Sequence, residues 1–292
     1  MLIDNNIWTI QKILVWTASF FSKFNIESPR LSSELLLAYT LGIKRIDLYL
    51  QYNKPLNNKE LKTYKELITR RANNEPVAYI LQKKEFWSKD FFITKDVLIP
   101  RPETETIVEI AIKELKKNNN NTKNIIELGT GSGVIIVSLA CEQENNEYYA
   151  TDYSENAIKI AKINADKYGL KNKIQFIIGD WIKPFKFAPV FDLIISNPPY
   201  IPDADINNLQ KEIVNYEPKI ALEGGTDGLN SIKNIIQNAY HILKPGGKII
   251  CEIGFNQKEK ITNIAKSTKK YTNIDCIKDY AGNYRFILLE KL

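Results

Sequence analysis

The sequence predicts an α/β protein whose mostly parallel sheet ends in an antiparallel hairpin and follows a small helical domain. Apolar residues in roughly the first quarter of the chain recur at helical spacing, with no strand pattern among them. From Asn124 onward, short apolar runs alternate with amphipathic helical stretches, which is typical of a parallel sheet covered by helices. The last two runs are too close together to hold a crossover helix. At roughly 150 residues per domain, the 292 residues suffice for two domains.

Residues 1–75 are expected to form the helical domain. Ser28, which precedes a proline, stands at the position of an N-cap, and Gly42 ends the helix that follows. Asn57 and Glu60 have the spacing of a capping box at the start of a further helix. We expect this domain either to recognise a partner or to cap the larger domain passively.

Residues 76–102 lack the helical pattern of the preceding segment and are predicted to link the two domains. Two aromatic pairs, Phe86-Trp87 and Phe91-Phe92, flank three polar residues at the spacing of a short hairpin. Two prolines then fix the backbone before a helix begins near Glu103. The larger domain would therefore span 103–292.

The sheet of the larger domain is predicted from short apolar runs with helical stretches such as Ala157–Lys167 and Leu229–Leu243 among them. The runs are Ile125–Leu128, Tyr148–Asp152, Ile174–Ile178, Phe191–Ser196, Lys248–Ile253, Ile274–Lys278 and Arg285–Leu289. Continuous apolar strands between helices indicate a parallel sheet that is buried on both faces. The short link around Gly282 makes the last two strands an antiparallel hairpin, whereas a nicotinamide-binding Rossmann domain is expected to end in another parallel strand. The domain is therefore predicted to be Rossmann-like with a different ending.

The composition is that of an ordinary globular protein. Apolar residues make up 44% and charged residues 25% of the chain, which excludes disordered, collagen-like and coiled-coil proteins. Forty Lys and Arg against 34 Asp and Glu leave a net charge of +6 that is spread along the chain, so a nucleic-acid partner is permitted but not required. No run approaches the ~20 apolar residues of a membrane span and no export signal is recognisable. We therefore expect a cytoplasmic protein with no membrane partner.

Metal and histidine chemistry are not expected. Cys141, Cys251 and Cys276 are scattered and no CxxC or HxxxH pair exists, so a Cys/His zinc cluster is excluded. The odd number of cysteines fits a reducing compartment. His241 is the only histidine, and it is expected to be a cation at a helix end rather than the base of a hydrolase.

A glycine-rich loop follows the first predicted strand of the sheet and precedes a helix. Its residues are Gly129, Thr130, Gly131, Ser132 and Gly133. Glycines at this position let the backbone approach a ligand and expose the amides of the helix N-terminus. Asp152 stands 19 residues after Gly133 at the end of the next strand, where a carboxylate accepts both hydroxyls of a ribose. The loop and Asp152 predict a nucleoside cofactor and leave its identity open.

The sequence Asn197-Pro198-Pro199-Tyr200 follows the fourth predicted strand. Ligands of open α/β sheets bind beyond the carboxyl ends of the strands, so this motif and the glycine loop are expected to meet. Two prolines remove two backbone donors and hold the chain extended, which leaves carbonyls and the Asn197 amide oxygen to accept hydrogen bonds. The ligand group that suits these acceptors is a planar NH2 group. Tyr200 can lie against the flat face of that group.

These motifs resemble those of the class I S-adenosylmethionine-dependent methyltransferases that act on planar amino nitrogens. More narrowly, the chain resembles the protein-(glutamine-N5) methyltransferase family of the HemK/PrmC type, whose members modify peptide chain release factors. The resemblance covers nearly the whole chain, and its blocks include Glu75–Ile80, Lys84–Trp87, Leu98–Glu105, Glu127–Gly133, Gly179–Trp181, Ser196–Ile201 and Glu217–Leu229. The Asn-Pro-Pro-Tyr motif is shared with nucleic-acid adenine methyltransferases, whereas Leu98–Glu105 and the Gly-Gly-Thr-Asp-Gly-Leu block are narrower.

The resemblance implies a role for each residue of the predicted site. The segment Gly129–Gly133 would wrap the methionine end of S-adenosyl-L-methionine, Asp152 would hold the ribose, and Trp181 would flank the adenine. Asn197 would bridge cofactor and substrate. The catalytic residues would be Asn197, Pro198 and Tyr200, with Pro199 completing the substrate pocket. The product would be S-adenosyl-L-homocysteine, and no metal is implied.

The implied substrate is the glutamine in the Gly-Gly-Gln loop of a peptide chain release factor, methylated on its side-chain nitrogen. One alternative is an adenine or cytosine amino methyltransferase acting on DNA or RNA. It would need a target-recognition domain or basic, aromatic-lined insertions to hold a flipped base, and the sequence offers none outside the N-terminal helices. A second alternative is a non-catalytic binding subunit with the same fold, which the intact cofactor loop and Asn-Pro-Pro-Tyr motif argue against.

Overall fold

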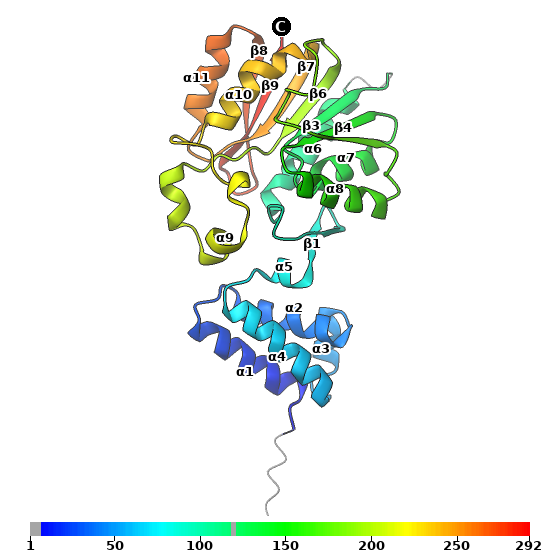
Figure 1. The fold of residues 1–292 in the computed structure, drawn as a ribbon, viewed down its shortest axis with the longest axis vertical. Coiled ribbons are helices and arrows are strands. Elements are labelled where there is room, and N and C mark those ends of the chain that lie inside the picture. The colour runs from blue at the N-terminus through cyan, green and yellow to red at the C-terminus, as the bar shows by residue number, and fades with distance from the viewer. Residues whose placement is uncertain (1–6, 118–120) are drawn as a thin grey trace, which may run out of the picture. The chain divides into compact units, whose positions relative to one another are not determined.

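The computed structural model describes residues 7–117 and 121–292. Contacts divide the chain into two compact units (Figure 1). The first comprises Met1–Gln82 together with Gln210–Tyr216, and the second comprises Lys83–Leu209 with Glu217–Leu292. Among the described residues, no helix combines the length and apolar character needed to cross a membrane.

The first unit is helical, as the sequence predicts. Its helices are α1 (Ile10–Lys23), α2 (Pro29–Leu41), α3 (Arg45–Leu50), α4 (Asn58–Ala72), α5 (Val77–Leu81) and the separate α9 (Lys211–Tyr216). The capping box of α4 is confirmed, because Asn57 accepts from the Glu60 amide at 2.9 Å and the Glu60 carboxylate accepts from the Asn57 amide at 2.8 Å. Ser28 precedes α2 as expected, but it has left-handed backbone angles and makes no capping hydrogen bond.

The helical unit extends to Gln82, beyond the predicted boundary at residue 75. Helix α5 belongs to it because Ile80 is buried in the same apolar cluster as α1, α2 and α4. Helix α9 joins the unit from the middle of the sequence. Its Glu212 lies 2.7 Å from the buried Arg71 guanidinium, and a buried charge of this kind requires a partner. No local pattern in the sequence indicates this partner.

The predicted hairpin after the helices is confirmed and belongs to the second unit. It consists of β1 (Lys83–Phe86) and β2 (Lys89–Phe92), paired antiparallel. The turn lies at Trp87 and Ser88, one residue earlier than the polar triplet suggests. Both have φ of 53°, as the tight two-residue turns of hairpins require.

The larger unit is built on a sheet of order β5-β4-β3-β6-β7-β9-β8. Its strands are β3 (Asn124–Leu128), β4 (Glu147–Asp152), β5 (Ile174–Ile178), β6 (Phe191–Ser196), β7 (Leu243–Glu252), β8 (Tyr271–Lys278) and β9 (Tyr284–Lys291). The pairs from β5 to β7 are parallel, and β9 lies antiparallel between β7 and β8. The predicted parallel sheet with a final antiparallel hairpin is therefore confirmed.

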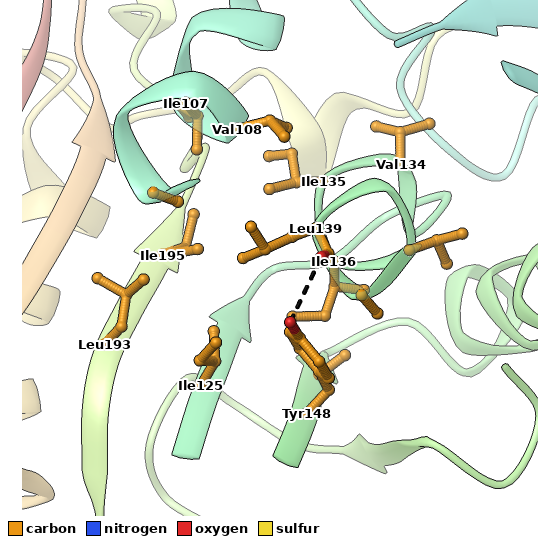
Figure 2. Close-up of a cluster of buried hydrophobic side chains, with 14 of the residues drawn as sticks. Ile107, Val108, Ile125, Val134, Ile135, Ile136, Leu139, Tyr148, Leu193 and Ile195 are labelled. Carbon is orange, nitrogen blue, oxygen red and sulfur yellow. Dashed lines mark hydrogen bonds between the residues drawn. The ribbon is translucent and has the colours of Figure 1, made fainter. Parts of the chain in front are cut away.

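Alternate residues of the central strands pack on opposite faces of the sheet. One face, which includes Ile125 and Ile195, packs against α6 (Glu105–Lys116), α7 (Val134–Glu142) and α8 (Glu155–Lys167). Figure 2 shows this cluster, with the Tyr148 hydroxyl donating to the Leu139 carbonyl at 3.3 Å. The other face, which includes Ile126 and Ile194, packs against α10 (Asn230–Asn238) and α11 (Lys258–Thr268). Burial on both faces explains why these strands are continuously apolar.

The predicted helix Leu229–Leu243 is too long. Helix α10 ends at Asn238, a 3-10 turn covers Ala239–His241, and Leu243 already begins β7. The predicted helix is too long because Ile242 and Leu243 stay in helical phase with α10, although Ile242 follows the 3-10 turn and Leu243 begins the next strand. His241 lies in the 3-10 turn and stacks on Phe187 with ring centroids 4.5 Å apart.

Candidate functional site

A cavity of about 380 Å³ lies beyond the carboxyl ends of β3, β4 and β6, and it lies wholly within the larger unit. Residues of the predicted site that line it are Gly129, Thr130, Gly131, Ser132, Asp152, Trp181, Asn197 and Pro199. The glycine loop and the Asn-Pro-Pro-Tyr motif therefore share one cavity, as predicted. Among the described residues, the predicted Gly133, Pro198 and Tyr200 are not part of its lining.

The glycine loop is fastened to the neighbouring strand by its backbone. The amides of Gly129 and Thr130 both donate to the Thr151 carbonyl at 2.9 Å. Gly129 and Gly131 have φ of 73° and 54°, which glycine adopts without strain. Gly133 caps α7 instead of facing the cavity, and a Cβ there would lie 3.1 Å from the Ala161 Cβ. Its role is to let two helices approach.

Asp152 is held in place by two backbone amides. One carboxylate oxygen accepts from the Gly131 amide and the other from the Ser154 amide, both at 2.8 Å. Desolvation raises the pKa of this carboxyl, and the amide hydrogen bonds oppose the rise. The Tyr153 amide also favours the ionised form, and because a carboxylate has about four acceptor sites, the fixed Asp152 can still accept a donor from the cavity. This geometry is compatible with the predicted ribose contact.

Trp181 and Gly129 both line the cavity and lie close together. A Cβ on Gly129 would lie 3.4 Å from the indole ring, so a larger residue there would press against the ring. Trp181 itself has φ of 52°, an unusual backbone conformation for a large side chain. The predicted contact between Trp181 and an adenine stays a prediction.

Glu127 lines the cavity although the sequence reasoning assigned it no role. It is only 1% exposed, and one carboxylate oxygen accepts from the Thr130 hydroxyl at 2.6 Å and from the Ile136 amide at 3.2 Å. Desolvation raises its pKa to about 8, the nearby Asp152 adds to the rise, and the two donors oppose it. A cation bound in the cavity would favour the ionised form of this carboxyl.

The Asn-Pro-Pro-Tyr segment places its two polar side chains in different environments. The Asn197 side-chain amide lines the cavity and donates to the Thr104 hydroxyl at 3.2 Å. The Tyr200 hydroxyl donates to the buried Glu252 carboxylate at 3.2 Å, and burial raises the pKa of the tyrosine. The hydroxyl of a buried tyrosine needs a partner, and here that partner is in the core. The hydrogen bond to Glu252 does not support the predicted stacking of Tyr200 on a substrate, which stays a prediction.

The Gly-Gly-Thr-Asp-Gly-Leu block is bound to the Asn-Pro-Pro-Tyr segment. The Gln257 side-chain amide donates to the carbonyls of Tyr200 and Gly228, at 2.9 and 3.1 Å. The Gly224 amide donates to the Ile201 carbonyl at 2.8 Å. The sequence singled out both blocks, but their contact depends on tertiary packing.

Gly228→Ala is expected to displace the Asn-Pro-Pro-Tyr segment. A Cβ at this position would lie 2.4 Å from the Tyr200 carbonyl oxygen, and the φ of +71° is itself unfavourable for alanine. We expect a loss of about 2 to 4 kcal/mol in unfolding free energy, measured by denaturant titration. Gly282→Ala is the control, because it has φ of +86° with nothing within 4 Å of its Cβ and should cost only about 1 kcal/mol. Equal losses of unfolding free energy in the two variants would contradict the close approach of Gly228 to the Tyr200 carbonyl.

A further part of the cavity wall, formed by residues near 101 and 218, is not assigned from the sequence. The Arg101 guanidinium lies 2.7 Å from one Glu217 oxygen, and the other oxygen accepts from the Ile99 amide at 3.2 Å. Arg101, Thr104 and Pro218 all line the cavity. These residues lie in Leu98–Glu105 and Glu217–Leu229, two segments that resemble the family. The sequence alone does not show which cavity the two segments line.

Comparisons with known proteins match each of the two units to a protein family. The model of the PrmC N-terminal domain matches residues 12–81, and a methyltransferase domain model matches residues 119–286. The chain is 40% identical over 262 residues to the release factor glutamine methyltransferase of Geobacter sulfurreducens, covering 90% of each chain. It is 41% identical over 265 residues to that of Coxiella burnetii, covering 91% of this chain and 93% of the relative.

A solved structure agrees with the fold. The crystal structure of a methyltransferase from Pyrococcus furiosus aligns with a TM-score of 0.52 at 22% identity, over 76% of this chain and 98% of the other. Together with the glycine loop and the sheet order, these matches define a class I methyltransferase. Within that class, the chain belongs to the release factor glutamine methyltransferase family.

Proposed function

We propose that this enzyme transfers a methyl group from S-adenosyl-L-methionine to the side-chain nitrogen N5 of the glutamine in the Gly-Gly-Gln loop of peptide chain release factors. The observation that carries the proposal is that Asn197 lines the same cavity as the glycine loop and Asp152, in a chain that belongs to this family. Because release factors act in translation termination, we place the enzyme in the cytoplasm.

The cavity fits S-adenosylmethionine in size and charge. Its volume of about 380 Å³ is within the range of small-molecule sites. When bound, this compound supplies a methyl group on a positively charged sulfonium. Two carboxyl groups, Glu127 and Asp152, line the cavity from the ends of adjacent strands and favour a cation. The residues that would hold the compound are the glycine loop, Asp152, Trp181 and Asn197.

The protein must make a poor nucleophile react. The lone pair of an amide nitrogen is delocalised into the carbonyl, the resonance that gives amides a rotation barrier of about 18 to 20 kcal/mol. As the nitrogen forms its bond to the methyl carbon, the electron pair of the breaking carbon–sulfur bond goes to sulfur, and an N–H proton is then lost to water. The Asn197 oxygen and the Pro198 carbonyl would accept the two N–H groups, whose positive charge grows in the transition state. Positioning also holds the nitrogen in line for transfer.

The raised pKa of Glu127 predicts a pH dependence of cofactor binding. In the cofactor-free enzyme Glu127 holds a proton below about pH 8, and a bound cation favours the ionised form. Affinity for S-adenosylmethionine should therefore rise with pH by up to about tenfold per unit between about pH 6 and pH 7.5. Calorimetry at several pH values measures this slope. Glu127→Gln should bind with a flatter slope, and equal slopes would show that Glu127 is not the titrating group.

We propose that the helical unit contributes to recognition of the release factor through an aromatic stripe that runs along α1, from Trp8 just before the helix to Phe24 at its C-cap. This stripe consists of Trp8, Trp16, Phe20 and Phe24. Trp16 stacks on Phe20 with ring centroids 5.2 Å apart, and Phe20 contacts Phe24 at 4.8 Å. Trp16 and Phe24 remain 46% and 47% exposed, and exposed aromatic residues of this kind are typical of protein interfaces.

Replacing Trp16 and Phe24 together by alanine should raise the KM for the release factor by about tenfold or more, because aromatic anchors carry much of the energy of an interface. The affinity for S-adenosylmethionine and the kcat should stay unchanged, since every cavity residue lies in the other unit. Leu50→Ala is the control, because Leu50 is 79% exposed on α3 of the same unit. An unchanged KM in the double variant would exclude the stripe from recognition.

A transfer assay tests the proposed function against its alternatives. The purified enzyme is incubated with methyl-labelled S-adenosylmethionine and, separately, with a release factor, DNA and RNA. We expect label in the release factor alone. Label in nucleic acid would favour the amino methyltransferase alternative, and no transfer to any substrate would favour a binding subunit.

A further inference from the structure

The role proposed for Asn197 depends on which end of its side-chain amide faces the substrate. Its oxygen accepts hydrogen bonds and its nitrogen donates them, so only the oxygen can receive an N–H of a substrate amide. The two ends are almost equal in size, and packing alone does not distinguish them. The protein therefore needs a polar contact that fixes the orientation.

Thr104 makes that contact from an element far away in the sequence. It ends the 3-10 turn Pro102–Thr104 before α6, is 3% exposed and lines the cavity. Its hydroxyl donates to a Glu252 carboxylate oxygen at 2.8 Å. A hydroxyl has a single hydrogen, so Thr104 can only accept from the Asn197 nitrogen, which lies 3.2 Å away.

Glu252, at the end of β7, fixes the direction of this chain of hydrogen bonds. It is 2% exposed, and an ionised carboxylate only accepts hydrogen bonds. Its other oxygen accepts from the Tyr200 hydroxyl at 3.2 Å, so each oxygen receives one hydroxyl hydrogen, which is the arrangement of an ionised carboxylate. Desolvation raises the pKa of Glu252, and the two hydroxyl donors and the positive charge of Arg285 oppose the rise. If Glu252 were a donor instead, the Thr104 hydroxyl would be free to donate to Asn197, and the amide could turn over.

We infer that Thr104 and Glu252 are positioning residues that hold the Asn197 amide with its nitrogen toward Thr104 and its oxygen toward the substrate nitrogen. The inference rests on the proposed function, because it explains how the acceptor for the glutamine N–H is kept in place. Neither residue needs to touch the substrate. The geometry consists of buried and partly buried hydrogen bonds that join the turn before α6, the end of β6 and the end of β7.

Thr104→Val tests the inference, because valine keeps the shape of threonine and removes the hydroxyl. We expect kcat to fall about tenfold, while the KM for the release factor and the affinity for S-adenosylmethionine stay within about twofold. Thr104→Ser keeps the hydroxyl and should recover most of the rate. A kcat of Thr104→Val equal to wild type would overturn the inference. The wild-type enzyme in the same assay tests the proposed function separately, since that function fails if wild type does not methylate the release factor.

A second background separates orientation from a general structural role. In Asn197→Asp both ends of the side chain are oxygens, so turning it over changes nothing. Adding Thr104→Val to Asn197→Asp should leave its residual rate within about twofold, whereas a structural defect would lower both backgrounds equally and overturn the inference.

Glu252→Leu gives an independent reading should Thr104→Val fold poorly. It removes the acceptor of the Thr104 hydroxyl, which is then free to donate to Asn197, so kcat should again fall about tenfold without a change in KM. An unchanged kcat in Glu252→Leu would overturn the inference.

Discussion

Asn197→Ala should lower the rate of glutamine methylation by about 10² to 10³, because it removes one preorganised acceptor that acts in the transition state. The side chain lines the cavity and its nitrogen is already engaged by Thr104 at 3.2 Å, which leaves the oxygen for the substrate. Single-turnover kinetics with a purified release factor measure the loss directly.

The affinity of Asn197→Ala for S-adenosylmethionine separates this role from damage to the cofactor site. The glycine loop and Asp152 remain, so the dissociation constant should change by less than about threefold. A variant that binds the cofactor normally and methylates at the wild-type rate would remove Asn197 from catalysis. A variant in which both properties fall equally would indicate that Asn197 acts only by holding the cofactor.

Asp152→Ala should weaken binding of S-adenosylmethionine by about tenfold to a hundredfold, the value of a charged hydrogen bond of about 1.5 to 3 kcal/mol. The carboxylate is fixed by the amides of Gly131 and Ser154, both at 2.8 Å, so it reaches the ligand without further ordering. Calorimetry on the cofactor-free enzyme measures the change.

Asp166→Ala is the control for Asp152→Ala. Asp166 lies on α8 and is exposed, so its removal changes the net charge equally without touching the cavity. Its effect on affinity should stay below about twofold, since exposed charges are screened. Equal effects from the two variants would mean that only long-range charge matters and would return Asp152 to a backbone-capping role.

Most of the fold follows from local patterns in the sequence. The runs 174–178 and 191–196 are strands with the predicted bounds. The central strand 191–196 is mostly buried and therefore mostly apolar, whereas 174–178 is the edge strand of the sheet and exposes Gln175. The final hairpin follows from the shortness of its link. The local pattern fails to locate the end of α10, because Ile242 and Leu243 continue the helical periodicity although the helix ends at Asn238 and Leu243 begins the next strand.

The candidate site could be predicted only in part. The glycine loop, Asp152 and Asn197 could be assigned to one cavity because each lies at the end of a strand whose position is evident from the sequence. The contacts of Thr104 with Asn197 and Glu252 join residues 93 and 148 positions apart, and no spacing rule reaches that far. The raised pKa of Glu127 depends on burial, which the sequence does not show.

Locating the added methyl group in the release factor tests the central claim most directly. The native factor and a variant with glutamate in place of the Gly-Gly-Gln glutamine are incubated with the enzyme and mapped by tandem mass spectrometry. We expect one methyl group on the side-chain nitrogen of that glutamine and none on the variant, because a carboxylate has no N–H to donate to Asn197. Methylation of both factors alike, or at another residue, would contradict the account.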